Sequence, residues 1–382
     1  MDYGVYLSDE GLCSENGRGV TSAEALLAGK CIASVAKKVV IAHNGEKSAE
    51  CLSLVAAAGA AERGSDVFFA SALPEPAFDL AMKLIGAKAG CFVSGGVFSK
   101  IKFFSERGLP LSTEDEEKIE KTLSGKETKV LSGYGKIRSI DGVSEVYSER
   151  IRNLLGDIKT AVKIYSPDRE VMAAAERIFP RCRGDGDIVF NISSDGRKVS
   201  AFSLSTGHIF YEKLLLLCSL AEFKGGNDIS LPFSSPVIID EIASEYGRKV
   251  TRYYERTKDF SDNSGRKNAL YCRFGRDALT LIAKILRYLE DNDLTLYEAL
   301  ENLPQFATVT RFVPRDNAED VFEKICTKKA GKNEGIAKCE NGERVIIKPA
   351  KSGRGFTLIA ESFRTETASE LCDFYEKKIK TL

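Results

Sequence analysis

Short apolar strands that alternate with helical segments constrain the fold of this chain more than any other feature. VVIAHN (39–44), SDVFFAS (65–71) and GCFVSGG (90–96) each have the pattern of a buried strand. The segments between them, 48–64 and 75–87, have the apolar spacing of helices. Strands separated by helices of this length favour a parallel sheet with helices on both faces. The sequence therefore predicts an α/β fold.

A helix is predicted before the first of these strands, over residues 21–38. Thr21 is followed three residues later by Glu24, which is the spacing of a capping box at a helix N-terminus. Gly, Ser and Lys dominate residues 123–143, and we expect a domain boundary there. The α/β pattern resumes after this boundary. Strand-like VIIKPA (345–350) and FTLIAESF (356–363), followed by a helix, indicate a small α+β domain at the end of the chain.

Composition limits the class of protein. A chain of 382 residues is too long for one ordinary core, so several domains are expected. Lys and Arg together number 55, as do Asp and Glu, so the basic excess typical of nucleic-acid binding is absent. No apolar run approaches a membrane span, and the N-terminus MDYGVYLSDEG lacks the regions of a signal peptide. We expect a cytoplasmic protein that binds neither nucleic acid nor membrane.

Cysteine and histidine usage argues against several kinds of site. The ten cysteines are scattered singly without a CxxC pair, so neither a zinc site nor a disulfide framework is expected. His43 and His208 are the two histidines, which leaves little room for His-based nucleophilic catalysis. We expect both to be structural.

The order of these segments resembles the α-D-phosphohexomutase superfamily, the phosphomannomutases and phosphoglucomutases. RGVTSAEALLAGKCIA (18–33), VVIAHNGEKSAECL (39–52) and ALPEPAFDLAM (72–82) are similar to the opening segments of that family. RFGRDALTLIAKILRYL (273–289) is similar to a later helix. The resemblance covers nearly the whole chain and implies three similar α/β domains plus a small C-terminal α+β domain around one cleft. We expect this chain to be a shortened version of that domain arrangement. The predicted domain limits are 1–127, 128–228, 229–308 and 309–382, with the second domain reduced.

The first family site falls on residues 93–102 of the first domain. In family enzymes, a serine in a T-A-S-H-N-P loop carries the phosphoryl group. Here the resemblance places Gly95 at that serine, and the nearby hydroxyls of Ser94 and Ser99 are displaced along the chain. Phosphoryl transfer depends on in-line positioning, so a displaced hydroxyl is a severe defect. We predict a tight loop here, with Ser94 and Ser99 as the candidates if any phosphoryl carrier remains.

The second family site is a D-x-D-x-D-R loop that holds magnesium through three carboxylates, the ligands that this cation prefers. It falls on residues 191–197 of the second domain. Counted back from Arg197, the three aspartate positions hold Ile192, Ser194 and Gly196. Asp195 lies one place out of register, as expected of a turn residue. We therefore predict no metal and no cofactor, although an active member of the family would need magnesium.

The third family site contacts the sugar and falls on residues 262–266 of the third domain. The residues at this site are Asp262, Ser264, Gly265 and Arg266. Ser264 and Gly265 match the family pattern, whereas the two charged residues are substitutions. The same stretch is also an ordinary turn, and both interpretations stay open.

The fourth family site grips the substrate phosphate and falls on residues 348–355 of the C-terminal domain. The candidate phosphate-binding residues are Lys348, Lys351, Ser352, Gly353 and Arg354. Backbone amides beside Lys and Arg make a plausible anion nest. The alternative is a solvated basic hairpin.

Three functions are compatible with these observations. The first is a phosphohexomutase-like protein that has lost its phosphotransferase activity and binds a hexose phosphate, or serves as a regulatory module for a protein partner that the sequence does not identify. The second is a divergent but active phosphohexomutase of carbohydrate metabolism that uses Ser94 or Ser99. The third is a different sugar-phosphate enzyme on the same scaffold, for which the sequence offers no separate catalytic set. Because fold does not imply function, the losses at specific sites favour the first.

Overall fold

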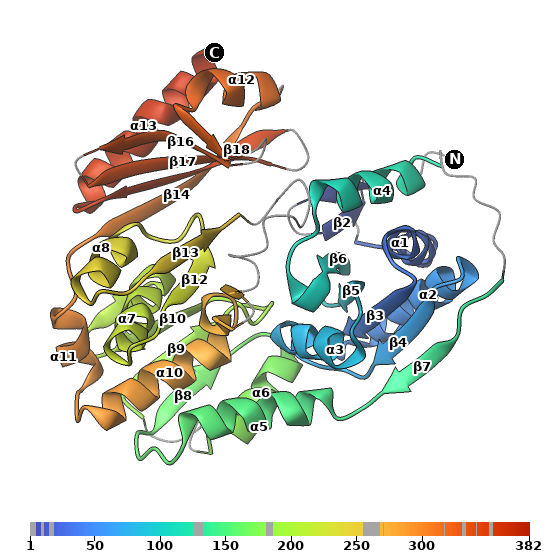
Figure 1. Ribbon diagram of the computed structural model, residues 1–382, viewed down its shortest axis with the longest axis horizontal. Coiled ribbons are helices and arrows are strands. Elements are labelled where there is room, and N and C mark those ends of the chain that lie inside the picture. Colours follow the sequence, from blue (N-terminus) through green and yellow to red (C-terminus); the bar gives the residue numbers. More distant parts are fainter. Residues whose placement is uncertain are drawn as a thin grey trace. The chain divides into compact units, whose positions relative to one another are not determined.

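The computed structural model describes residues 5–8, 11–14, 19–125, 133–180, 186–254, 268–269, 271–316, 318–330, 334–340, 342–350 and 354–382. The chain divides into two compact units. The first comprises Met1–Tyr211 and Arg273–Leu294, and the second comprises Glu212–Cys272 and Thr295–Leu382. Within the described residues, the strands form four sheets, two in each unit (Figure 1).

The first sheet has seven strands among the described residues, in the order β1-β2-β6-β5-β3-β4-β7. They are β1 (Val5–Ser8), β2 (Gly11–Ser14), β3 (Lys38–His43), β4 (Asp66–Ala70), β5 (Ala89–Ser94), β6 (Lys100–Ser105) and β7 (Ile137–Ile140). The predicted parallel pairing is confirmed for β3, β4 and β5. Strands β6 and β7 were not predicted: β7 pairs in parallel with β4, whereas β6 turns back from the Gly95 loop and pairs antiparallel with β5. The sheet is therefore mixed.

Helices lie on both faces of this sheet. They are α1 (Ser22–Val35), α2 (Lys47–Glu62), α3 (Phe78–Ile85) and α4 (Thr113–Leu123), with short turns η1 (Glu75–Ala77) and η2 (Glu106–Gly108). Helices α1 and α2 share a core with the sheet face of Ile41 and Cys91. Phe78 of α3 packs on Phe92 and Phe104 of the opposite face. The arrangement is the three-layer sandwich that the helix–strand alternation predicted.

Helix α1 begins as the sequence predicted. The Thr21 hydroxyl accepts a hydrogen bond from the backbone amide of Glu24, and the Glu24 carboxylate accepts one from the amide of Thr21. This capping box satisfies two backbone donors that the helix itself leaves unpaired. Further along, a Cβ at Gly29 would lie 1.9 Å from the carbonyl oxygen of Ala56. Glycine at this position therefore lets α1 and α2 pack closely.

The second sheet has the order β11-β10-β9-β8. Its strands are β8 (Val162–Tyr165), β9 (Ile188–Ile192), β10 (Val199–Ser203) and β11 (Gly207–Ile209). Its helices are α5 (Val143–Leu155), α6 (Arg169–Ile178) and α10 (Ala278–Asp291), the last preceded by the turn η3 (Arg273–Gly275). Helix α10 comes much later in the chain but packs on α5 within the first unit. The segment around residue 277 is thereby brought next to residues of the first sheet's domain.

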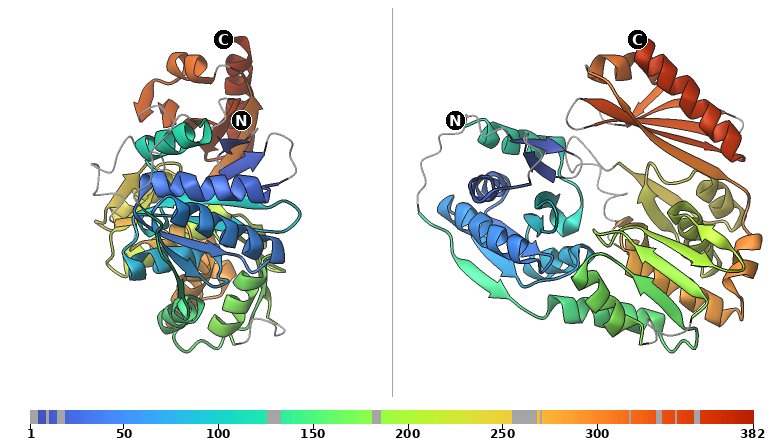
Figure 2. Two further views of the ribbon diagram at one scale, coloured as in Figure 1. Left: turned by 90° about the vertical axis from the view of Figure 1, so that its right-hand side faces the viewer. Right: turned by 180° about the vertical axis from the view of Figure 1, so that it is seen from behind.

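The second unit contains two sheets (Figure 2). The smaller pairs β12 (Ile229–Pro232) in parallel with β13 (Val250–Tyr253), accompanied by α7 (Tyr211–Lys224), α8 (Ile238–Glu245) and α11 (Leu296–Glu301). The larger is antiparallel, with β14 (Ala307–Pro314), β18 (Gly355–Ser362), β17 (Glu343–Pro349), β16 (Glu334–Glu340) and β15 (Lys328–Ala330) in that order. Helices α12 (Ala318–Ile325) and α13 (Thr365–Thr381) share one apolar core with it. This is the α+β domain predicted for the end of the chain.

A buried ion pair on the larger sheet of the second unit forms hydrogen bonds with the segment that follows β12. The Arg344 guanidinium lies 2.6 Å from Oε1 and 3.0 Å from Oε2 of Glu361. It also donates to the backbone carbonyls of Phe233 and Ser235, while Glu361 accepts from the backbone amide of Val237. Each charged group of the pair therefore has partners, which is the condition for tolerating two charges away from water.

The predicted fold class, α/β domains followed by an α+β domain, is confirmed by these sheets. The predicted domain limits stay a prediction. Two elements cross these limits. Strand β7 follows residue 128 but pairs with β4 of the predicted first domain, and α10 lies in the range of the predicted third domain but packs in the first unit. Within the described residues, no helix is both long and apolar enough to cross a lipid bilayer.

Candidate functional site

The Gly95 loop connects β5 to β6 as a hairpin. Ser94 ends β5 opposite Lys100, the first residue of β6. Ser99 lies on the other side of the loop, where its backbone carbonyl accepts a 3.0 Å hydrogen bond from the amide of Val20. Within the described part of the chain, neither serine hydroxyl forms a hydrogen bond with a side chain that could act as its base. Among the described residues, the two hydroxyls therefore have no activating partner.

Gly95 itself is held closely by its surroundings. Its backbone amide donates a 2.9 Å hydrogen bond to Oδ1 of Asn44, the residue after β3. A Cβ built at Gly95 would lie 2.5 Å from Oγ of Ser48 and 2.7 Å from Cβ of Glu46. These distances are shorter than ordinary van der Waals contacts, so a serine at this position would require its neighbours to move. The Gly95 backbone is therefore closely packed in this hairpin.

Asn44 connects this loop to the second sheet. Its Nδ2 donates a 3.1 Å hydrogen bond to Oδ2 of Asp168, while Oδ1 of Asp168 caps α6 by accepting from the backbone amides of Glu170 and Val171. Burial raises the pKa of Asp168, and its hydrogen bonds oppose this shift in part. The two sheets of the first unit are thus joined by a side-chain bond between buried groups.

His43 has a structural position next to Asn44. Its Nδ1 accepts a 3.2 Å hydrogen bond from the backbone amide of Gly45, and burial lowers its pKa, opposed by the charge of Glu50. A lowered pKa keeps the imidazole neutral at neutral pH. His208 lies on β11, where its ring packs against Phe210.

Asp195 lies in the turn between β9 and β10 and is held there by hydrogen bonds from neighbouring residues of the same turn. Its Oδ1 accepts hydrogen bonds from the Ser193 hydroxyl at 2.6 Å and from the Arg197 amide at 3.2 Å. Its Oδ2 lies 3.5 Å from Nζ of Lys102. Burial works to raise the pKa of Asp195, but the Lys102 charge and the Ser193 hydrogen bond outweigh it and lower the pKa. Asp195 is therefore an ionised turn residue.

Glu75 is the buried centre of this region. Its side chain is 3% exposed and accepts from Nε of Arg197 at 2.6 Å and from Nζ of Lys102 at 3.0 Å. The three residues come from η1, from the β9–β10 turn and from β6. Sequence analysis missed Glu75 and Lys102, because no local motif marks either residue.

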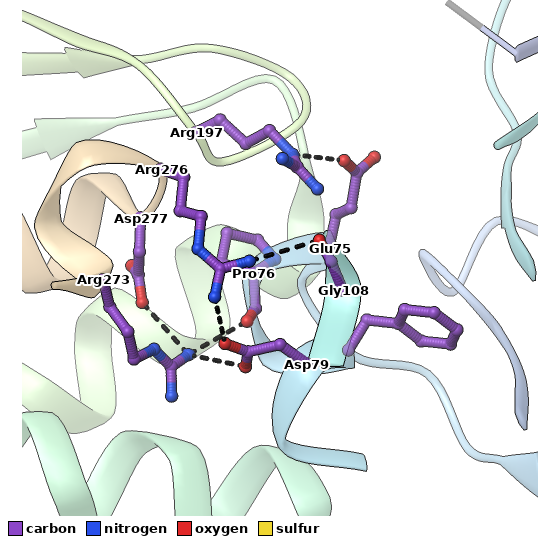
Figure 3. Close-up of a pocket in the computed structure, with 9 residues that line it drawn as sticks. Glu75, Pro76, Asp79, Gly108, Arg197, Arg273, Arg276 and Asp277 are labelled. Carbon is purple, nitrogen blue, oxygen red and sulfur yellow. Dashed lines mark hydrogen bonds and ion pairs between the residues drawn. The ribbon is translucent and has the colours of Figure 1, made fainter. Parts of the chain in front are cut away.

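A small pocket lies beside Glu75, lined by charged side chains (Figure 3). Arg273 lies 3.0 Å and Arg276 3.4 Å from the Asp79 carboxylate, and Arg273 also lies 3.3 Å from Asp277. The Asp277 carboxylate is buried and accepts from the Tyr147 hydroxyl at 2.9 Å. Each of these guanidinium groups faces a carboxylate, so the pocket presents no excess positive charge to an anion.

Comparison with solved structures shows which proteins share this fold. The chain has the fold of a phosphoglucomutase/phosphomannomutase family protein from Burkholderia thailandensis, with a TM-score of 0.70 at 14% identity over 95% of this chain and 94% of that one. A structure described as a putative phosphomannomutase from Thermus thermophilus gives a TM-score of 0.68 at 13% identity over the full length of both chains. At this identity, the similarity shows the fold.

Sequence similarity covers the first domain. Residues 8–129 match the family model for phosphoglucomutase/phosphomannomutase, alpha/beta/alpha domain I. The phosphoglucosamine mutase of Nitrobacter winogradskyi is 34% identical over 125 residues, and that of Caldicellulosiruptor bescii is 28% identical over 127 residues. Residues 8–129 are therefore similar to domain I of the phosphoglucomutase/phosphomannomutase family, and the chain as a whole has the fold of the two solved structures named above. The matched segment covers 31% of this chain and 28% of each of these two mutases.

The magnesium ion of the phosphohexomutases does not fit the residues present here. The side chains of Ile192, Ser194 and Gly196 supply no carboxylate at the family positions. Among the residues that the structure describes, no three His, Cys, Asp or Glu side chains converge as a metal site would require. Asp195, the remaining carboxylate of the loop, is already paired with Lys102.

The predicted sugar and phosphate loops are only partly described. Asp262, Ser264, Gly265 and Arg266 lie outside the described residues, as do Lys351, Ser352 and Gly353. Lys348 lies near the end of β17, and its ammonium is 2.9 Å from the buried carboxylate of Glu334. Arg354 is exposed just before β18. Two of the predicted phosphate ligands are thus described. The charge of Lys348 is paired with that of Glu334, and the side chain of Arg354 is exposed.

Proposed function

We propose that this chain is a phosphohexomutase-like protein that has lost intramolecular phosphotransfer and retains the capacity to bind a phosphosugar. The observation that carries this proposal is Gly95, which stands where family enzymes have the phosphoryl-carrying serine. A phosphoryl group needs a nucleophilic oxygen aligned with its acceptor. The hydrogen bond from Gly95 to Asn44 and the lack of room for a side chain beside Ser48 and Glu46 support a structural role for this loop.

The charge balance near the loop supports the same proposal. A phosphotransferase stabilises a dianionic phosphoryl group with metal ions or unpaired cations. Here Lys102 and Arg197 are paired with Glu75, and Lys102 also with Asp195. Positive charge that is already neutralised within the protein stabilises a transition state weakly.

The class of ligand follows from the relatives and from the C-terminal loop. Two relatives of the first domain are phosphoglucosamine mutases, so glucosamine phosphate joins glucose and mannose phosphates as ligands to test. We propose that Arg354, with Lys351, Ser352 and Gly353, contacts the phosphate, and that residues 262–266 contact the sugar. Exposed cations are screened by salt, so affinity should be modest and should fall as ionic strength rises. A regulatory role toward a protein partner and a cytoplasmic location are parts of the same proposal.

Calorimetry combined with phosphorus NMR tests this function. The full chain should bind a hexose 6-phosphate and should leave hexose 1-phosphates unconverted in the presence of magnesium and a hexose bisphosphate. A Lys351→Ala, Arg354→Ala double variant should bind more weakly, because Arg engages phosphate with two donors. Lys83→Ala, an exposed lysine on α3, serves as the matched control. Equal binding by the double variant, or no binding by any protein, would remove phosphosugar binding from the proposal.

The second candidate function is an active phosphohexomutase that uses Ser94 or Ser99. It is favoured by the position of Ser94, which ends β5 directly opposite Lys100, and by the family match over residues 8–129. The same NMR assay distinguishes the two functions. Interconversion of hexose phosphates that is abolished by Ser94→Ala or Ser99→Ala would establish the active enzyme.

A further inference from the structure

Strand β7 forms one edge of the first sheet (Figure 1). It pairs in parallel with β4, and no strand in the described part of the chain pairs with its other side. The amide of Val67 donates to the carbonyl of Lys136, so the even-numbered residues of this segment bond toward β4. The backbone N–H and C=O groups of Ile137 and Ser139 therefore face the open edge. These groups are placed to pair with another extended chain.

The side chains of β7 are accessible on both faces of the sheet. Ile137 is 49% exposed, Arg138 and Ser139 are exposed, and Ile140 is half-buried. Because side chains alternate along a strand, Lys136 and Arg138 lie on one face, and Ile137 and Ser139 lie on the other. A strand added to β7 would therefore place every second side chain beside two cations and the others beside Ile137.

A row of lysines crosses the amino ends of the parallel strands on the face of Lys136. The register aligns Lys38 of β3 with Asp66 of β4, and it places Lys88 and Lys136, each just before its strand, in the same row. Asp66 is bound by the Arg138 guanidinium at 3.3 Å and by the Lys136 amide at 2.9 Å. Among the described residues, none of the three lysines has a carboxylate partner for its ammonium. We call Lys38, Lys88, Lys136 and Arg138 the basic patch, whose positive charge exceeds that of its one carboxylate.

The basic patch favours an acidic protein segment over a polynucleotide. Phe68 lies beside Arg138 in the next row of the sheet. Its ring centroid is 5.7 Å from the Lys38 ammonium and 5.5 Å from the Arg138 guanidinium, so two cations already contact the ring. A base would have to displace these cations to stack on Phe68. The open backbone groups of β7 pair with a peptide backbone, which a polynucleotide lacks.

We propose that β7 and the basic patch bind an extended acidic segment of a partner protein. The segment adds to the sheet through the backbone groups of Ile137 and Ser139. Its carboxylates occupy alternate positions beside Lys136 and Arg138, and apolar or β-branched side chains lie between them beside Ile137. This inference rests on the regulatory part of the proposed function, for which it gives the chemistry of the partner, and it does not involve phosphosugar binding.

Fluorescence anisotropy with labelled synthetic peptides tests the proposal on the full-length chain. The probe is a peptide of about eight residues that alternates Glu and Val, and the reference peptide alternates Lys and Val. The native protein should bind the Glu peptide and not the Lys peptide, and the affinity should fall as NaCl is added. Hydrogen exchange should show that the Glu peptide protects the amides of Ile137 and Ser139.

Two substitutions separate the backbone contribution from that of charge. Ser139→Pro removes an outward-facing N–H, which an edge strand tolerates, and should weaken binding of the Glu peptide about tenfold, whereas Ser139→Ala should bind as the native protein does. Lys136→Glu should weaken binding by about the same factor, because like charges then face each other. Lys121→Glu, which reverses an exposed lysine on α4, should leave binding unchanged. If Ser139→Pro does not fold, a Glu peptide with N-methylated amides tests the same bonds on the native protein.

Four results with these peptides would overturn the proposal: no binding of the Glu peptide, equal binding of the Lys peptide, binding that blocked backbone pairing does not weaken, or binding that Lys136→Glu leaves unchanged. Tighter binding of a single-stranded oligonucleotide or of phosphatidylserine vesicles, lost in Lys136→Glu, would also overturn it and assign the patch to nucleic acid or membrane. A dimer of the native chain that Ser139→Pro dissociates would assign the edge to a second copy instead. Because no sugar is present, failure here leaves the binding and turnover experiments to decide the phosphosugar part of the proposed function.

Discussion

The side chain of Asn44 donates a 3.1 Å hydrogen bond to the buried carboxylate of Asp168. The same amide accepts a bond from the backbone of Gly95, so one residue fixes the Gly95 loop and joins the first two sheets. These two bonds fix the position of the loop, as a structural role requires.

Asn44→Ala should destabilise the protein by about 1–3 kcal/mol, because it leaves the Gly95 amide and Asp168 without their partner. Urea unfolding followed by circular dichroism measures the change. Asn191→Ala, an exposed asparagine on β9, should have a much smaller effect. Equal effects of the two substitutions would mean that the Asn44 bonds contribute nothing specific.

Asp168 should make stability fall as the pH rises. Burial raises its pKa above the ordinary value of 3.8, so just above that pH the folded chain holds a proton that the unfolded chain has released. The contribution of Asp168 to the free energy of unfolding is full below pH 3.8 and is lost as the pH rises through its raised pKa. Asp168→Asn keeps a helix-capping oxygen but cannot accept the Asn44 hydrogen bond, so it should be less stable than the native protein at pH 3.8, and this difference should shrink as the pH rises toward neutrality. A difference that stays constant with pH would contradict this assignment.

Asp195 should have the opposite pH dependence. Burial opposes its ionisation, but Lys102 and Ser193 prevail and lower its pKa below 3.8. Its contribution is full above pH 3.8 and is lost as the pH falls through the lowered value. Asp195→Asn should therefore be less stable than the native protein near neutrality and should approach it in acid. A widening gap in acid would show that another group is responsible.

Gly95→Ser should not create a phosphohexomutase. The new Cβ would meet Ser48 and Glu46 at 2.5 and 2.7 Å, and we expect a loss of about 1–3 kcal/mol from overpacking. Chemical denaturation measures the loss, and Ser48→Gly in the same chain should recover part of it. Full stability together with hexose phosphate turnover would show that the loop accepts the family serine.

Arg344→Ala should cost about 3–5 kcal/mol, because it leaves Glu361 charged and buried on the larger sheet of the second unit. The double variant Arg344→Ala, Glu361→Ala should recover part of this loss, since no uncompensated charge remains. Denaturant unfolding of the native protein, the two single variants and the double variant forms a double-mutant cycle. Additive effects would contradict a direct coupling between the two side chains.

The fold was largely predictable because its signals are local. The apolar runs at 39–44, 65–71 and 90–96 correspond to β3, β4 and β5, and Thr21 with Glu24 marks the start of α1. Strand β6 was missed, because two glycines precede KIKFFS and its alternation is too short to outweigh them.

The candidate site was predictable only where a family position could be checked. Gly95 was recognised because it stands where the family has a serine. The loop 191–197 was recognised because it lacks the three aspartates of the family. Lys102, Glu75 and Asp195 were not brought together, because Lys102 lies 27 residues from Glu75 and 93 residues from Asp195, and no spacing rule connects them. Charge pairs of this kind depend on the tertiary arrangement of the sheets.

The central claim is that the Gly95 loop carries no phosphoryl group. Intact-mass analysis after incubation with a hexose bisphosphate and magnesium tests it most directly, with peptide mapping of residues 89–105 to locate any adduct. The account predicts an unchanged mass and no conversion of glucose 1-phosphate, mannose 1-phosphate or glucosamine 1-phosphate. A single phosphoryl adduct on Ser94 or Ser99, formed and discharged as a hexose phosphate is converted, would contradict it.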